Sequence, residues 1–209
     1  PARFSPDPGI FRHYGLEPDD RLFVARFSAN DAAHDSGVRT IPDELVASIC
    51  ERLRVVGHVL LSQEGRETVL LHRSVKPAGI GRGQGIAGED HVRVAPEHFL
   101  DLLAHAELFV GDSGSVAMES VALGIPALRI ADIDRPILAE IERRIGTLEN
   151  FRWSDSARLL HRIDAKLREN MHTSHEPGRI DSPPAPFEDL VGWYADLIER
   201  AATANLTRP

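Results

Sequence analysis

Short apolar runs alternate with amphipathic helical patterns along most of this chain, and this alternation limits its possible folds more than any other feature. Apolar runs of about four to eight residues suit buried strands, whereas apolar residues repeated every three or four positions suit helices packed on a sheet. Together they predict an α/β fold of Rossmann-like type, an open parallel sheet with helices on both faces. The expected strands are Arg21–Phe27, His58–Gln63, Glu67–Arg73, His91–Val94, Leu108–Gly111 and Pro126–Ala131.

Length and charge narrow the class of protein further. The chain has 209 residues, enough for one sizeable domain, and a net charge of −8, whereas proteins that bind nucleic acid are more often basic. No apolar run approaches the length of a membrane-spanning helix. Because the single cysteine, Cys50, cannot form an internal disulfide, we expect it to be a small buried residue in a cytoplasmic protein.

The segment Glu107–Ile130 carries the strongest functional signal. It predicts a strand, a turn of small residues at Gly111–Ser115, a helix and a second strand. The first N–H groups of a helix lack acceptors within the helix and carry partial positive charge, so this turn suits a phosphate or diphosphate. Glu119, four residues after Ser115, lies on the same helix face, about 6 Å further along the axis, where a carboxylate can bind the hydroxyls of a ribose.

A purely structural interpretation of this segment also exists. Asp112 or Ser113 can serve only to cap the helix, with Glu119 exposed to solvent. A capping box places its acidic residue three positions after the capping residue. Glu119 lies six positions after Ser113 and four after Ser115, so a capping box does not explain it.

The same segment resembles the carboxyl-terminal half of GT-B fold proteins. It is similar to the UDP-N-acetylglucosamine 2-epimerases and to a related family of glycosyltransferases of unassigned function. Four elements carry the resemblance, in the order in which those families have them: Asp112-Ser113-Gly114-Ser115, Glu119, Leu123-Gly124-Ile125-Pro126 and Asp134-Arg135-Pro136.

The resemblance implies roles for four residues. Ser113, Gly114 and Ser115 would hold the diphosphate of a nucleotide sugar, with a UDP-sugar favoured, and Glu119 would bind its ribose hydroxyls. The epimerases carry His-Arg-Arg-Glu-Asn after the first strand of this half, whereas this chain has Ala25–Gly37 there, with Arg26 and His34. In this segment the chain is more similar to the glycosyltransferase family.

The resemblance also implies how the chain is organised. A GT-B protein has two Rossmann-like halves with the active site between them, so we expect residues 1–20 to be a connector from an N-terminal half that this chain lacks. Residues 21–173 would form the nucleotide-binding domain, and 174–209 a Pro-rich loop and a final helix, Phe187–Ala202. The expected activity of the intact protein is glycosyl transfer. A sugar-nucleotide 2-epimerase and a non-catalytic nucleotide-binding or interaction module are the alternatives, and a homo-oligomer is compatible with each.

Two further side chains are candidates for the site. Arg26 ends the first strand at the expected ligand edge and either holds the diphosphate or forms a surface ion pair. His34, followed by Asp35, is the candidate catalytic base, although a hydrogen bond that organises its loop explains the pair equally simply.

Two other patterns do not support a ligand site. The loop Gly79–Gly88 lacks the Gly-x-Gly-x-x-Gly spacing of a dinucleotide fingerprint, which favours a surface loop or a lid. No group of residues has the spacing of metal ligands, His172 and His175 included. We therefore expect neither a metal nor a cofactor.

Overall fold

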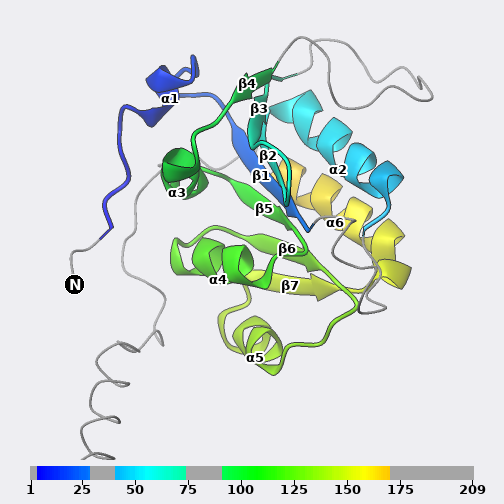
Figure 1. Ribbon diagram of the computed structural model, residues 1–209. Coiled ribbons are helices and arrows are strands. Elements are labelled where there is room, and N and C mark those ends of the chain that lie inside the picture. The colour runs from blue at the N-terminus through cyan, green and yellow to red at the C-terminus, as the bar shows by residue number, and fades with distance from the viewer. Residues whose placement is uncertain (1–3, 29–40, 74–90, 170–209) are drawn as a thin grey trace, which may run out of the picture.

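The computed structural model describes residues 4–28, 41–73 and 91–169. Its centre is a seven-stranded sheet with the order β4-β3-β2-β1-β5-β6-β7 (Figure 1). Five strands are parallel, and β3 and β4 are antiparallel to their neighbours. The strands are β1 (Leu22–Phe27), β2 (His58–Gln63), β3 (Val69–Leu71), β4 (His91–Arg93), β5 (Leu108–Gly111), β6 (Ala127–Ile130) and β7 (Leu148–Phe151).

Helices cover both faces of this sheet, which confirms the predicted Rossmann-like α/β fold. The pair α2 and α6 lies on one face, and α1, α3 and α4 lie on the other (Figure 1). Two short 3₁₀ turns precede α3 and α6. The helices are α1 (Ile10–His13), α2 (Asp43–Val56), α3 (Phe99–Ala104), α4 (Gly114–Ala122), α5 (Pro136–Ile145) and α6 (Ser156–Glu169).

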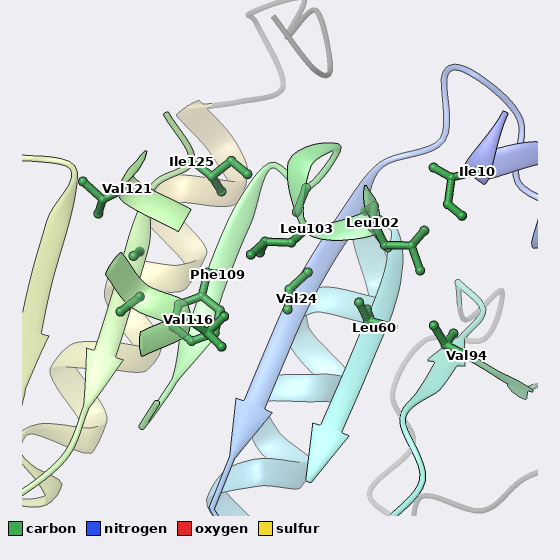
Figure 2. Packing of buried hydrophobic residues seen from close by; sticks show 14 of the residues in the cluster. Ile10, Val24, Leu60, Val94, Leu102, Leu103, Phe109, Val116, Val121 and Ile125 are labelled. Atoms are coloured by element: carbon green, nitrogen blue, oxygen red, sulfur yellow. The ribbon is translucent and has the colours of Figure 1, made fainter. Parts of the chain in front are cut away.

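The strands have apolar side chains on both faces, and these form two separate clusters. In β1, Val24 belongs to the cluster under α3 and α4, whereas its neighbour Phe23 belongs to the cluster under α2 and α6. Figure 2 shows the first cluster, in which Phe109 of β5 packs close to Val116 of α4. Cys50 is buried in the second cluster as expected, and burial raises the pKa of its thiol to about 12.

Several details differ from the sequence-based expectations. The sheet is not wholly parallel, because β3 runs opposite to its two neighbours β2 and β4, and β7 was not predicted at all. Within the expected connector, Ile10 and Tyr14 are buried in the cluster under α3.

The loop Gly79–Gly88 and residues 174–209 lie outside the described residues. In the described part of the chain, no helix is both long and apolar enough to cross a membrane.

The order of the parallel strands reverses between β1 and β5. From β1 the chain passes to β2 on one side, and it returns to β5 on the other side before continuing through β6 to β7. The helices that follow β1 and β5, α2 and α4, pack on opposite faces of the sheet, so the strand order reverses at the carboxyl ends of these two strands. In open α/β sheets this is the usual position of a ligand.

Gly111 sets how closely β5 approaches β1 at this point. A Cβ atom on Gly111 would lie 2.0 Å from the carbonyl oxygen of Arg26, a distance that requires the backbone to move. We therefore expect Gly111→Ala to lower the free energy of unfolding by about 1–3 kcal/mol, the usual cost of overpacking. Urea denaturation measures the change.

Gly9→Ala is the matched control for this substitution. Its Cβ would meet only the flexible side chain of Asp7, at 3.3 Å, and its φ of −90° suits any residue. We expect a change in the free energy of unfolding of less than about 1 kcal/mol. Equal losses in the two variants would show that the contact at Gly111 does not limit the packing of β5.

Candidate functional site

The candidate site lies at the carboxyl ends of β1 and β5, where the strand order reverses. Arg26 of β1 pairs in register with Gly111 of β5, and the N–H of Asp112 donates to the carbonyl of Arg26 at 3.2 Å. Helix α4 begins three residues after the end of β5. This arrangement brings Arg26 to the same edge of the sheet as the first turn of α4, although Gly114 lies 88 positions after Arg26 in the sequence.

The first turn of α4 is capped by its own residues. The Oγ of Ser113 accepts a hydrogen bond from the N–H of Val116 at 3.4 Å and lies 3.2 Å from the Oγ of Ser115. Ser113 is thus the helix cap that the structural interpretation proposed. The N–H groups of Gly114 and Ser115 occupy the first two helical positions, which have no acceptor within a helix, so they remain suited to an anion.

Gly114 lies where α4 meets the start of α5. A Cβ atom there would come within 3.2 Å of Cδ1 of Leu138 and 3.5 Å of Cδ of Arg135. The Asp134-Arg135-Pro136 element is thereby brought to the same helix terminus as the Asp-Ser-Gly-Ser turn. Sequence reasoning assigned Arg135 no role, because its proximity to Gly114 follows from how α5 packs.

Glu119 is exposed, one turn further along α4. Partial desolvation raises the pKa of its carboxyl, and the positive charge of Arg26 acts in the opposite direction. The two side chains are therefore electrostatically coupled without forming an ion pair within the described residues. Glu119 remains available to accept hydrogen bonds from a ligand.

Arg26 is half-buried and held from two sides. Its Nη1 donates to the Oγ of Ser62 at 2.8 Å, and its guanidinium carbon lies 5.8 Å from the ring centroid of Phe99. The hydroxyl of Thr68 also donates to Ser62, at 3.2 Å. Neither Ser62 nor Phe99 was a sequence candidate. The position of Ser62 could have been inferred, because parallel strands end at the same edge of a sheet and Ser62 pairs in register with Arg26.

Asp112 connects the loops that follow β1 and β5. Its two carboxylate oxygens accept the N–H of Ser28 at 2.9 and 3.1 Å. Burial raises the pKa of this carboxyl, whereas the bonds from Ser28 and the charge of Arg129 lower it. Asp112 thus links the turn that follows β5 to the residue that follows β1.

Most of the predicted site residues lie at this edge of the sheet. Arg26, Ser113, Gly114, Ser115 and Glu119 are described, whereas His34 lies outside the described residues. In the same described ranges, no group of three or more His, Cys, Asp or Glu side chains is arranged to hold a metal ion.

Comparison with known proteins finds similarity in structure but not in sequence. No family model matches the chain, and no curated protein matches it. A solved structure of a protein from Listeria monocytogenes, named as a UDP-N-acetylglucosamine 2-epimerase, is similar over 99% of this chain and 49% of its own, with 21% identity and a TM-score of 0.48. The wall teichoic acid polymerase TagF is similar over 94% of this chain and 47% of its own, with 12% identity and a TM-score of 0.39.

These similarities concern the fold. The chain spans about half the length of both proteins.

Asp112→Asn tests the raised pKa of Asp112. When a carboxyl has a higher pKa in the folded state, the folded state binds more protons between the two pKa values, so stability falls as pH rises through that window. The window runs from the ordinary value of 3.8 up to the raised value. Asn keeps an acceptor for Ser28 and cannot ionise, so we expect the variant to gain stability relative to wild type as pH rises.

Unfolding free energies determined between about pH 3 and about pH 7, the range over which carboxyls titrate, measure this difference. Asp19→Asn, on an exposed turn, is the control for removing one acidic charge. The interpretation is wrong if Asp112→Asn and Asp19→Asn show the same pH dependence.

Proposed function

We propose that this chain is the nucleotide-sugar-binding domain of a glycosyltransferase. The observation that carries the proposal is the meeting of three features where the strand order reverses. They are the first turn of α4, the guanidinium of Arg26 and the carboxylate of Glu119. The helix turn and the guanidinium match a diphosphate, and the carboxylate matches a ribose.

The diphosphate would bind at the amino terminus of α4. The N–H groups of Gly114 and Ser115 supply donors together with the positive end of the helix dipole, and the hydroxyl of Ser115 is exposed. Arg26 adds a positive charge already oriented by Ser62 and Phe99, which lowers the entropy lost on binding. Arg135, beside Gly114, is a second guanidinium within reach of the same helix terminus.

The ribose would be bound by Glu119. Ser115 and Glu119 are separated by about 6 Å along the helix axis, so a phosphate at the tip places the attached ribose near the carboxylate. Two vicinal hydroxyls can both donate to one ionised carboxylate, and such charge-assisted bonds are stronger than neutral ones. UDP is the favoured nucleotide because of the family that the motif resembles.

In glycosyl transfer the acceptor oxygen forms a bond to the anomeric carbon as the bond to the diphosphate oxygen breaks. The helix terminus and Arg26 would stabilise the negative charge that develops on the departing nucleoside diphosphate. The acceptor proton would pass to a base, either His34 or a residue of a second half-domain.

Glu119→Gln tests the ribose contact. Gln removes the charge but keeps the size of the side chain, so we expect the dissociation constant for UDP to rise about tenfold or more. Calorimetry with UDP and UDP-N-acetylglucosamine measures it, and Glu51→Gln on the exposed surface of α2 is the control. If UDP does not bind the wild type, the chain is not a nucleotide-binding domain and the interaction module is the better interpretation.

The pH dependence of the affinity tests the same residue without changing the fold. The ionised form of Glu119 is the one that accepts from the ribose, and its pKa is raised by desolvation. We therefore expect the affinity for UDP to fall as pH drops through the raised pKa in the wild type, beyond any fall seen in Glu119→Gln. Identical pH profiles in the two proteins would contradict a role for this carboxylate.

Turnover separates the two enzyme activities from the non-catalytic nucleotide-binding module. Transfer of sugar from a UDP-sugar by the full-length protein supports the glycosyltransferase. Conversion of UDP-N-acetylglucosamine to its 2-epimer, or release of UDP from it, supports the epimerase. Binding of UDP without turnover by the full-length protein supports a non-catalytic module.

A further inference from the structure

Arg129 is a buried cation whose position the proposed function does not explain. Only 4% of the residue is exposed, and it lies in β6 next to Gly111, with which it pairs in register. Its Nε has no hydrogen-bond partner within the described residues. Its remaining bonds are long, 3.4 Å from Nη1 to Oδ1 of Asn150 and 3.4 Å from Nη2 to the carbonyl of Ile133.

Arg129 lies on the same face of the sheet as Arg26, on the other side of Gly111. Side chains alternate along a strand, and Val24, Phe109 and Ala127, each two residues earlier, all belong to the cluster under α4. Arg26 and Arg129 are thus two strands apart, a backbone separation of about 10 Å. Between them Gly111 contributes no side chain.

A cavity of about 320 Å³ opens beside Arg129, between the ends of β6 and β7 and the start of α5. Its charged lining includes Arg129 and Arg135. Three acidic side chains also line it, but each has another partner. Asp134 is bound by Arg152 at 2.6 Å, Glu142 accepts from both the backbone and the side chain of Asn150, and Asp155 accepts from the N–H of Arg152.

Both arginines therefore line the cavity, and neither forms an ion pair with a carboxylate among the described residues. Burial lowers the pKa of Arg129 below its ordinary range, and repulsion from Arg135 lowers it further, whereas Asp112 and Asp134 act in the opposite direction. An unpaired buried charge is costly, and an anion bound in the cavity offsets the cost through its attraction to the guanidinium.

We propose that Arg129 and Arg135 form a second oxyanion site, which binds a phosphate or carboxylate group in this cavity. The site adjoins the helix terminus of α4, which Arg135 also approaches, and it does not require that the ligand be a nucleotide. A planar guanidinium suits both groups, because each presents two oxygens. A ligand that reached both sites would carry an anionic group in addition to a diphosphate.

The test follows the Nε–H signal of Arg129 by nuclear magnetic resonance in the ¹⁵N-labelled full chain. Arg129→Lys identifies the signal by removing it. Inorganic phosphate and acetate are added separately, without nucleotide, to millimolar concentrations. We expect a saturable shift with at least one of them. Phosphate alone would indicate a phosphoryl ligand, and acetate alone a carboxylate ligand.

Arg135→Gln and Arg168→Gln complete the test. Arg135 is exposed and supplies the second guanidinium, so its loss should weaken the anion affinity about tenfold or more. Arg168, exposed near the end of α6 and outside the lining of the cavity, is the matched control and should leave the affinity unchanged. The proposal is overturned if neither anion shifts the signal saturably, or if both variants weaken binding equally. Neither result depends on whether UDP binds.

Discussion

The close approach of β5 to β1 at Gly111 is the constraint on which both the fold and the candidate site depend. The carbonyl of Arg26 occupies the space that a side chain at Gly111 would need, so the two strand ends lie side by side. The same contact places Arg26 next to the turn that starts α4. Asp112 then joins the turn after β5 to Ser28, the residue that follows β1. One packing requirement thus positions a cation and a helix terminus together.

Much of this fold could be predicted from local sequence, and the exceptions have physical causes. The central strands are apolar on both faces, a pattern that alternation with helices makes easy to recognise. Strand β7 was missed because its two middle residues, Glu149 and Asn150, are polar, as an edge strand permits. The antiparallel pairing of β3 with β2 and β4 could not be predicted, since apolar content does not encode direction and β4 is exposed throughout.

The candidate site divides in the same way between local and distant contributions. Ser113, Gly114, Ser115 and Glu119 belong to one helix, so their relative positions follow from helical geometry. Other neighbours of the site come from other elements, and only sheet register and helix packing bring them close. They are Ser62, Phe99, Arg129 and Arg135. Buried arginine also carries no local signal, because the pattern around Arg129 is that of an ordinary strand.

The charges at this edge are difficult to explain by stability alone. Acidic residues outnumber Lys and Arg by 32 to 24 in the chain, yet Arg26, Arg129 and Arg135 form no ion pair within the described residues. The nearby carboxylates of Asp112 and Asp134 are used by Ser28 and Arg152 instead. A buried guanidinium without a counterion opposes folding, and an apolar residue of similar size would remove that cost. Any anion that binds only the folded state stabilises it by mass action, so binding of the proposed ligand would offset the cost of burying Arg129 without an ion pair.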